Sequence, residues 1–527
     1  MDLKFKKVSF HENELLFGRD ATPYITAVEF DGKNVMEIFY RQKNNVVSKK
    51  EAFKPFILLE DTVYLDGWDG TYEAKRLKGD AYYKYLVFLE TWADLQLVLK
   101  HFKKKTGASP ASMGAPFYYL NDPVHQYLLC SGQTLFKEML FGDLVRLQLD
   151  IETYCAEGYE FSNPHRVEDR ITLISLSDSS GWEHVISGRE YEEKEMLEVM
   201  VEQINLRDPD VIEGHNIFNF DLTYIEARAR RYKVPLAIGR NKQTIKSHSS
   251  RLNIAERTIS YKKFEVYGRH IVDTYLLAQM YDVTARNLES YGLKNVARHF
   301  NVASQDRTYL EPDKLSWYYD NKPEELLKYG LDDVRETRAI SEILSQSFYY
   351  QARIFPYSFQ NTIIRGNATK INSLFIREYI NSGNSIPRTS QSREYSGGYT
   401  DMFLQGVINR VLYCDVQSLY PSIMLTFKYF PKVDELNIFH SLLSDLKDFR
   451  LKAKEKMLTA KAKSEKMYYD ALQSTFKVLI NSFYGYLGFA YGHFSDFEEA
   501  NRVTAKGREI IKSMIEWLED NDCKVIE

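Results

Sequence analysis

Hydrophobic and polar positions alternate differently along the chain, and the changes of pattern divide it into regions. Residues 1 to about 125 hold short apolar or alternating runs, such as 21–30 and 53–60, separated by Asp-Gly pairs that are typical of turns. This pattern predicts an N-terminal mixed β/α domain over residues 1–135. The segment carries no evident chemistry, so we interpret it as a scaffold.

From about residue 140 the pattern becomes that of an α/β domain. Residues 144–151 and 171–177 are predicted to be paired strands, and 190–204 has the periodicity of an amphipathic helix. A short strand at 211–212 runs into Gly214. Pro323 suits the first turn of a helix that continues to about residue 344. We therefore expect an α/β domain over residues 136–345.

The remaining third of the chain is mostly helical. Residues 346–390 read as mixed helix and loop, which we interpret as a return to the N-terminal domain or a linker. A glycine-bearing joint follows at 394–399. Residues 423–476 are Lys-rich with few breaks, a pattern that predicts two antiparallel helices.

Size and charge limit the possible classes of protein. A chain of 527 residues is too long for one hydrophobic core, so roughly three or four domains are expected. The net charge of −4 does not by itself indicate nucleic-acid binding, so the placement of charge matters more. Residues 450–466 hold seven Lys/Arg against two Glu, and 227–269 hold twelve against two. The second stretch is either a strand-guiding surface or a solvated insertion.

Carboxylates occur at positions that strands and helices should bring together. Asp150 and Glu152 lie on one face of a predicted strand, because side chains alternate with period two. Asp221 follows where a helix begins, and Tyr329 and Asp333 share a helix face. Four carboxylates so close together favour Mg²⁺ or Mn²⁺ over zinc. Two such ions about 4 Å apart can activate water and stabilise the leaving oxygen of a phosphodiester.

In order and spacing these motifs resemble the three exonuclease motifs of the DnaQ-like 3′→5′ proofreading domain of family B DNA polymerases. The resemblance implies an RNase H-like fold with two metal ions in the active site. It implies that Asp150, Glu152 and Asp333 hold the first ion and that Asp150 and Asp221 hold the second. By the same resemblance, Tyr329 orients the attacking water.

Further positions match this family pattern. The side chains implied to place the terminal nucleotide are Asn216 and Phe220. Residues 268–273 (GRHIVD) and 291–297 (YGLKNVA) match flanking features. Asp332 stands beside Asp333, and the spacing of four from Tyr329 selects Asp333.

A second group of motifs lies closer to the C-terminal end. Residues 412–416 are predicted to be a strand that ends in Asp415, followed by a turn at 418–421 whose backbone N–H groups can cradle phosphates. Lys477 and Asn481, four residues apart, share one helix face, and Arg450 and Lys454 share a face of the preceding helix in the same way. Such cations provide most of what a protein supplies in phosphoryl transfer.

Residues 415–422 (DVQSLYPS) and 477–485 (KVLINSFYG) resemble two of the three polymerase motifs of family B. The implied regions are a palm over 391–430, fingers over 431–484 and a second part of the palm over 485–527. The resemblance implies a metal site at Asp415 and Val416. The implied dNTP contacts are Ser418, Leu419, Tyr420 as steric gate, Arg450, Lys454, Lys477 and Asn481. The implied DNA contacts are Tyr395, Gly397, Gly398, Tyr484 and Gly485.

The third motif of that family, Asp-Thr-Asp, does not follow Gly485. We therefore expect the N-terminal part of a split or truncated DNA-directed DNA polymerase with a 3′→5′ exonuclease. A second polypeptide would carry the missing motif and the thumb. The alternatives are a fragment, a standalone 3′→5′ DNA exonuclease with an inactive palm, and a non-catalytic DNA-binding assembly subunit.

The expected partners are primer–template DNA, dNTPs and Mg²⁺ or Mn²⁺, with two ions in each active site. The four cysteines form no Cys-x-x-Cys pair, which argues against a zinc site. No signal peptide and no run of 18 apolar residues is evident, so no membrane partner is expected. We expect a cytoplasmic, nucleoid-associated location.

Overall fold

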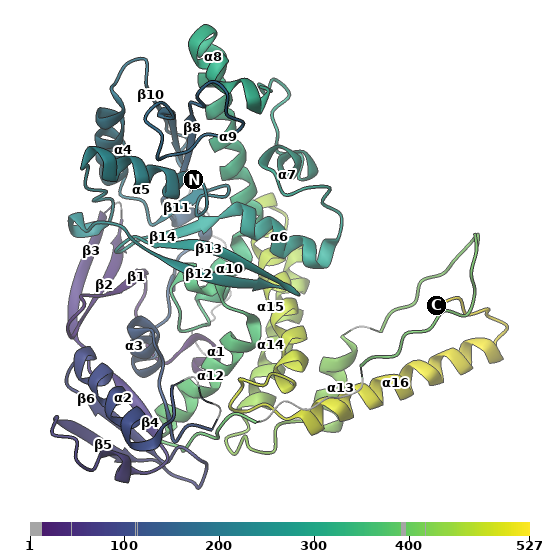
Figure 1. The fold of residues 1–527 in the computed structure, drawn as a ribbon. Coiled ribbons are helices and arrows are strands. Elements are labelled where there is room, and N and C mark those ends of the chain that lie inside the picture. Colours follow the sequence, from purple (N-terminus) through teal and green to yellow (C-terminus); the bar gives the residue numbers. More distant parts are fainter. Residues whose placement is uncertain (1–12, 44, 111, 113, 391–396, 417) are drawn as a thin grey trace.

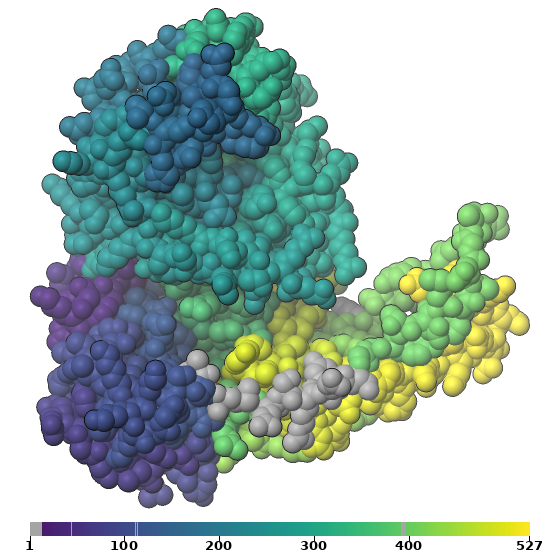
Figure 2. Space-filling view, viewed as in Figure 1, coloured from purple at the N-terminus to yellow at the C-terminus, as the bar shows by residue number. Residues whose placement is uncertain are grey.

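The computed structural model describes residues 13–527, except 44, 111, 113, 391–396 and 417. In Figure 1 the N-terminal part lies below the α/β domain, and the C-terminal helices lie beside both. An arm made of residues 397–416 and the helix α16 (Phe497–Asp520) projects from the main body, as the space-filling view in Figure 2 also shows. No helix in the described chain combines the length and hydrophobicity needed to cross a membrane.

Two antiparallel sheets form most of the N-terminal part. The first has the order β1-β2-β3, with bounds Ile25–Phe30, Val35–Gln42 and Asn45–Ala52. The second has the order β5-β6-β4-β7, with bounds Tyr72–Arg76, Tyr85–Leu89, Phe56–Leu59 and Phe117–Tyr118. The helices of this part are α1 (Glu14–Phe17), α2 (Trp92–Thr106) and α3 (Pro123–Ser131). Helix α2 begins with a capping box between Thr91 and Asp94.

A five-stranded mixed sheet forms the centre of the α/β domain. Its order is β10-β9-β8-β11-β14, and β8 pairs antiparallel with β9 but parallel with β11. The bounds are β8 (Arg146–Thr153), β9 (Ile171–Asp178), β10 (Glu183–Ser187), β11 (Val211–Gly214) and β14 (His270–Asp273). The predicted strands at 144–151, 171–177 and 211–212 are therefore confirmed, and so is the α/β class of this region. A separate hairpin, β12 (Lys246–Ile254) with β13 (Arg257–Glu265), carries much of the basic stretch.

Helices cover both faces of the central sheet. Leu147, Leu149 and Ile151 of β8 pack in one apolar cluster with α4 (Glu193–Arg207) and α5 (Asp221–Tyr232). The opposite face of β8 is polar and lies under α9, which runs from Pro323 to Leu344 as predicted. The other helices of this domain are α6 (Thr274–Ala285), α7 (Leu293–His299) and α8 (Leu315–Asn321). The period-two alternation of β8 thus directs apolar side chains to one layer and carboxylates to the other.

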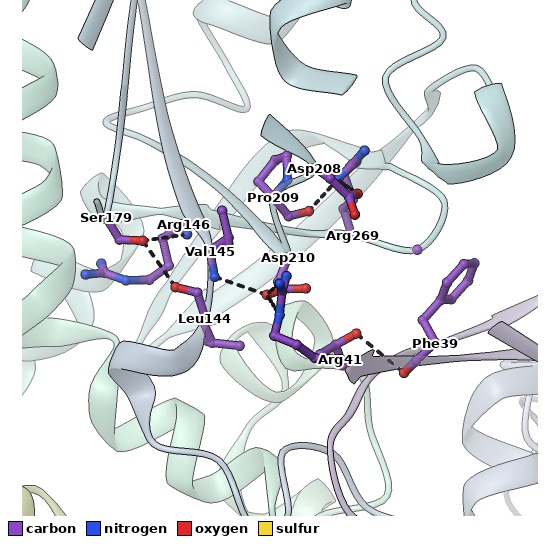
Figure 3. A network of polar contacts seen from close by, with 12 residues as sticks. Phe39, Arg41, Leu144, Val145, Arg146, Ser179, Asp208, Pro209, Asp210 and Arg269 are labelled. Atoms are coloured by element: carbon purple, nitrogen blue, oxygen red, sulfur yellow. Dashed lines mark hydrogen bonds and ion pairs between the residues drawn. The ribbon is translucent and has the colours of Figure 1, made fainter. Parts of the chain in front are cut away.

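A buried ion-pair network joins the N-terminal sheet to the α/β domain (Figure 3). Arg41 on β2 donates to Asp210 Oδ2 through Nε (3.0 Å) and Nη2 (2.6 Å). The backbone N–H of Val145 donates to the same oxygen at 3.1 Å. Nearby, Arg269 donates to Asp208 Oδ1 at 2.7 Å. Because Val145 and Asp210 directly precede β8 and β11, the network fixes where these strands begin.

The C-terminal third is helical, as the pattern predicted. The helices are α10 (Gln346–Ala352), α11 (Phe359–Ile364), α12 (Asn367–Ser382), α13 (Leu419–Phe427), α14 (Ile438–Thr459) and α15 (Lys463–Leu487). Isolated bridges join Asn384 to Lys78 and Ile386 to Tyr83, so the chain after α12 lies against the N-terminal part. Helices α14 and α15 pack along each other as the predicted antiparallel pair.

The prediction of a strand at 412–416 is wrong. The described residues between 397 and 418 form no strand, and most of them are exposed. Among the described residues, the backbone–backbone hydrogen bonds of this segment go to the Ile526 carbonyl, which accepts from the N–H groups of Phe403 and Leu404. A strand needs a ladder of such bonds, which this segment lacks among the described residues. The predicted turn at 418–421 is instead the start of α13, with Ser418 in a left-handed conformation (φ 54°) as its N-cap.

Candidate exonuclease and nucleotide-binding sites

Three carboxylates meet where β8 passes under α9. Asp150 and Glu152 on β8 and Asp333 on α9 each place an oxygen within 4.8 Å of the other two. Glu152 is 8% exposed and Asp333 is 6% exposed, while Asp150 is partly exposed. The cluster is therefore nearly closed to solvent except along one side of Asp150. The two-residue repeat of β8 puts Asp150 and Glu152 on one face of the strand, and the helical repeat puts Asp333 on the face of α9 that meets them.

A fourth carboxylate belongs to Asp221, the first residue of α5. Its Oδ1 accepts a hydrogen bond from the backbone N–H of Ile151 at 3.1 Å, so it lies against the strand that carries the other acids. The side chain is 1% exposed. Burial, together with the charges of Asp273 and Asp333, raises the pKa of Asp221 to about 8, although backbone N–H groups oppose the shift.

The acidic residues destabilise one another's charged forms. Burial is the largest cause that raises the pKa of Asp150, followed by the charges of Asp221, Asp333 and Glu152. Burial and the charge of Asp333 likewise raise the pKa of Glu152. Asp150 Oδ2 is buried and has no hydrogen-bond partner among the described residues. A partnerless oxygen among four hard ligands fits a divalent cation.

Two cations that sequence reasoning missed stand at the edge of this cluster. The Lys294 ammonium donates to the Tyr329 hydroxyl and lies 4.2 Å from the centre of its ring. Arg307 forms an ion pair with Asp333 and donates through Nε to Glu336 at 2.9 Å. Lys294 lies inside the family-like segment 291–297, which was the available signal. No sequence pattern marked Arg307.

The structure also separates the two adjacent aspartates on α9. Asp332 Oδ2 accepts the backbone N–H of Thr308 at 2.9 Å, so this side chain holds the preceding loop. Asp333 faces the carboxylates of β8. Of the two aspartates, Asp333 is therefore the one that lies in the carboxylate cluster.

Asn216 and Phe220 lie on the loop that connects β11 to α5. Asn216 has a left-handed backbone (φ 65°), and Phe220, directly before Asp221, is 38% exposed. Their predicted contact with a terminal nucleotide stays a prediction. Both are close in sequence to the carboxylate that touches β8.

The second group of predicted residues converges on α13, α14 and α15. Arg450 on α14 donates through Nη1 to Ser418 Oγ at 3.0 Å. The rings of Tyr420 on α13 and Tyr484 on α15 have centroids 4.5 Å apart. A Cβ at Gly507 of α16 would lie 3.0 Å from Tyr420 Cε1, so the ring packs directly against that helix.

Other predicted nucleotide contacts are exposed. Lys477 and Asn481 lie on the exposed side of α15 and Lys454 on that of α14. Within the described part of the chain, no hydrogen bond or ion pair engages these three side chains. They are therefore accessible to a ligand. Leu419 begins α13, and Gly485 is an exposed position on α15.

The remaining predicted residues are not gathered into a site. Asp415 is exposed and Val416 is half-buried, and both lie in the irregular segment before α13. Tyr395 lies outside the described residues. The Gly397 carbonyl accepts from Arg508 Nη1 at 2.6 Å, and a Cβ at Gly398 would lie 3.0 Å from the Tyr420 hydroxyl.

Comparisons with known proteins match one family model to part of each region that carries these residues. Residues 130–296 match the model of the family B DNA polymerase exonuclease domain, and residues 428–527 match the model of family B DNA polymerases. The first range contains Asp150, Glu152 and Asp221, and the second contains Arg450, Lys477 and Asn481.

Individual relatives agree with these matches. DNA polymerase 1 of Pyrococcus abyssi is 26% identical over 95% of this chain and 69% of its own length. A DNA polymerase of Thermococcus gorgonarius is 27% identical over 72% of this chain and 51% of its own length. The chain thus spans between about half and about two thirds of these relatives.

A solved structure shares the fold. The family B DNA polymerase from the hyperthermophilic archaeon Pyrobaculum calidifontis superposes with a TM-score of 0.73. The superposition covers 94% of this chain and 72% of the other, at 19% identity. The two family models, the relatives and the common fold agree, and the chain belongs to the family B DNA polymerases, with the exonuclease domain of that family.

Proposed function

We propose that the α/β domain is a divalent-metal-dependent 3′→5′ DNA exonuclease and that α13, α14 and α15 bind dNTPs for template-directed synthesis. The observation that carries the first part is the convergence of Asp150, Glu152 and Asp333 within 4.8 Å, with one buried oxygen of Asp150 that no group in the described part of the chain engages. Asp221 supplies a fourth carboxylate to the same strand.

The residues fit two Mg²⁺ or Mn²⁺ ions. Asp150, Glu152 and Asp333 would hold one ion, and Asp150 with Asp221 would hold the other. When bound, such ions lower the pKa of water and stabilise the leaving oxygen of a phosphodiester. The side chains of the protein would orient the water, place the DNA strand and balance the charge.

Tyr329 and Lys294 are suited to orient the attacking water. Because the Lys294 ammonium donates to the Tyr329 oxygen, the hydroxyl hydrogen remains available to bind a water molecule. Burial and the charges of Asp333, Glu152 and Asp150 raise the pKa of Tyr329, so it stays a neutral donor. Arg307 forms an ion pair with Asp333 and so balances part of the negative charge of the cluster.

The end of the DNA strand would enter beside the loop before α5. The partly exposed ring of Phe220 offers a surface on which a base can stack, an interaction that tolerates any sequence. Asn216 would add hydrogen bonds to the terminal nucleotide. An exonuclease that edits DNA needs this tolerance because any nucleotide can be misincorporated.

The dNTP proposal rests on cations of α14 and α15, of which Lys454 and Lys477 are exposed and Arg450 is half-buried. Arg450, Lys454 and Lys477 can together attract the three phosphates of an incoming nucleotide. The Tyr420 ring is fixed between Tyr484 and Gly507. A fixed ring beneath the sugar would exclude a 2′-hydroxyl and so select deoxynucleotides.

Several expectations stay predictions. They are the metal site at Asp415 and Val416, the DNA contacts of Gly397, Gly398, Tyr484 and Gly485, a second polypeptide, and a nucleoid-associated location. The exposed position of Asp415 favours one alternative, an exonuclease without synthesis by this chain alone. The experiment below separates the two activities.

The test uses the 527-residue chain on a labelled primer–template with Mg²⁺, with and without the four dNTPs. We expect the primer to be degraded from its 3′ end, and the double variant Asp150→Ala/Glu152→Ala to lose this activity. A control variant, Glu198→Ala/Glu202→Ala, removes two exposed carboxylates from α4 and should degrade the primer normally. Mg²⁺-dependent degradation that persists in the first double variant would disprove the exonuclease assignment.

The same reactions test the nucleotide-binding proposal. Extension of the primer by the double variant in the presence of dNTPs would support synthesis by this chain. If the primer is neither extended nor protected by dNTPs at any concentration, α14 and α15 do not bind nucleotides productively. The exonuclease-only alternative would then be favoured.

A further inference from the structure

The family-like segment 268–273 has no role in the mechanism above. It ends in Asp273, the last residue of β14 and the N-cap of α6, whose side chain is 4% exposed. Both carboxylate oxygens are engaged by backbone N–H groups. Asp273 is therefore not free to bind a metal ion in this arrangement, and another reason for its buried charge is needed.

The contacts of Asp273 reach outside its own helix. Its Oδ1 accepts the N–H of Tyr275 at 3.0 Å, which is an ordinary N-cap bond, and the N–H of Asn216 at 2.9 Å. Its Oδ2 accepts the N–H of Phe218 at 3.3 Å. One carboxylate thus ties α6 to the loop that carries Asn216 and Phe220.

That loop has a backbone that needs external support. Asn216 is left-handed (φ 65°), a conformation that costs energy for residues other than glycine, although asparagine adopts it more readily than most. The turn is tight, because a Cβ at Gly214 would lie 2.7 Å from the Cβ of Ile217. Two inward-pointing N–H groups, of Asn216 and Phe218, would be unsatisfied without the carboxylate.

A second anchor acts on the same loop from the neighbouring residue. His215 Nδ1 lies 2.9 Å from Thr274 Oγ1, and His215 Nε2 lies 2.8 Å from the Tyr291 carbonyl oxygen. Because a carbonyl can only accept, Nε2 carries the hydrogen of its contact with Tyr291. The Thr274 hydroxyl also lies 3.2 Å from the Gly214 carbonyl oxygen, so it contacts the start of the same loop. Tyr291 begins the other family-like segment, 291–297, so both segments bind this loop.

We propose that Asp273 is a positioning residue for the exonuclease, which holds residues 215–220 so that Asn216 and Phe220 meet the terminal nucleotide. The inference rests on the proposed exonuclease function. Asp273 lies at the base of the loop and is assigned no contact with DNA. The same restraint leads the chain into Asp221, whose carboxylate meets β8.

The alternative is that Asp273 only caps α6. Other caps in the chain show what that role requires. Asp122 accepts the N–H of His125 within its own helix α3, and Asp496 accepts those of Glu498 and Glu499 within α16. Each of these caps also has one distant contact, because Asp122 accepts the side-chain NH₂ of Asn361 at 3.1 Å and Asp496 accepts the backbone N–H of Lys432 at 3.2 Å. Asp273 differs from both because it accepts two backbone N–H groups of one distant loop, those of Asn216 and Phe218.

The variant Asp273→Ser separates the two roles. Serine caps helices about as well as aspartate but is too short to keep both loop contacts. The variant Asp273→Asn keeps one acceptor oxygen and turns an NH₂ group toward a donor. Asp122→Ser changes a cap without touching the loop and is the control. The readouts are KM and kcat for a labelled single strand with Mg²⁺, and amide hydrogen exchange of the peptide that contains residues 214–221.

We expect Asp273→Ser to raise KM about tenfold or more, because two hydrogen bonds to a charged acceptor are lost. Hydrogen exchange of the loop should accelerate, while kcat changes less and the control resembles the wild type. Asp273→Asn should raise KM and accelerate loop exchange in the same way but by less. This variant replaces Asp273→Ser in the test if the serine variant does not fold. Wild-type KM and loop exchange in both variants would overturn the inference.

The two hypotheses fail in different ways. If the wild-type chain does not degrade DNA, the proposed function fails, whereas the exchange measurement still decides whether Asp273 holds the loop. If the wild type is active and neither KM nor exchange responds to Asp273, the inference alone is wrong.

Discussion

Removing the charge of Asp221 should stabilise the metal-free protein while it abolishes DNA degradation. This carboxyl is 1% exposed, and its pKa is raised from 3.8 to about 8 by burial and by Asp273 and Asp333. A carboxyl with a higher pKa in the folded than in the unfolded chain destabilises the fold whenever it must ionise. In Asp221→Asn the carbonyl oxygen can still accept the N–H of Ile151.

The size of the effect follows from the pKa difference. Each pKa unit corresponds to about 1.4 kcal/mol, so a carboxyl shifted this far costs at most about 5 kcal/mol at pH 8. Relaxation around the charge and proton sharing among the four acids reduce this figure, and we expect on the order of 2–5 kcal/mol. For a domain of this size, about 2 kcal/mol corresponds to a rise in Tm of about 4–8 °C.

The dependence on pH has a definite sign. The cost is absent below pH 3.8, grows between pH 3.8 and about 8, and is constant above that. The advantage of Asp221→Asn should therefore be greatest at pH 8 and above. It should shrink by roughly 1.4 kcal/mol for each pH unit as the pH falls toward 5.

The assay is thermal unfolding in EDTA at several pH values, repeated with Mg²⁺ or Mn²⁺. A divalent ion should stabilise the wild type more than Asp221→Asn, because the ion neutralises the same charge. Asp313→Asn removes an exposed carboxylate and serves as the control. If Asp221→Asn is no more stable than the wild type at pH 8 in EDTA, or if its advantage is independent of pH, the reasoning is refuted.

Two further substitutions test how the acidic cluster is supported. At Gly330 on α9, an added Cβ would lie 2.5 Å from Ser175 Oγ, so Gly330→Ala should push α9 away from β9. We expect the free energy of unfolding to fall by about 1–3 kcal/mol and DNA degradation to become slower. Asp210→Ala leaves the buried Arg41 without its partner and should cost about 3–5 kcal/mol in chemical denaturation. A double variant, Arg41→Met/Asp210→Leu, should recover part of that loss. If Gly330→Ala were as stable as the wild type, the close packing of Gly330 against Ser175 would be contradicted. If Asp210→Ala were as stable as the wild type, the contribution of the Arg41–Asp210 ion pair would be contradicted.

The convergence of the carboxylates in the candidate exonuclease site could be predicted because short-range periods place them. Asp150 and Glu152 share a face by strand alternation, and Tyr329 and Asp333 share one by helix repeat. The strand and the helix are each visible in the sequence over at least eight residues. Their packing against each other then follows from the apolar and polar faces of β8.

The supporting groups could not be predicted because they act between distant segments. Arg307 reaches Asp333 from a loop without periodicity, and Asp273 reaches Asn216 across 57 residues. Nothing in the local pattern shows which backbone N–H groups a buried carboxylate will satisfy. The family-like segments 268–273 and 291–297 marked the right stretches without indicating their role.

The strand predicted at 412–416 is absent for a different reason, because here the local pattern indicated an element that the rest of the chain does not support. Its apolar residues have the composition of a strand, but strand formation depends on partners elsewhere in the chain. The described neighbours provide few hydrogen bonds, and Leu412 and Tyr413 are about nine-tenths exposed. Amino-acid composition therefore predicted a strand here, whereas the structure depends on pairing with another strand.

The two candidate sites carry unbalanced charge of opposite sign. A single polyanionic substrate can therefore bind at both sites, but under different conditions. In the exonuclease cluster, Lys294 and Arg307 are engaged with Tyr329, Asp333 and Glu336, so a negative excess remains that favours metal ions. On α14 and α15, exposed lysines without acidic partners in the described chain leave a positive excess that favours phosphates. A polyanion can satisfy the second site directly but can approach the first only together with divalent cations. Metal removal should therefore stop degradation while leaving the attraction of nucleic acid to the helices in place.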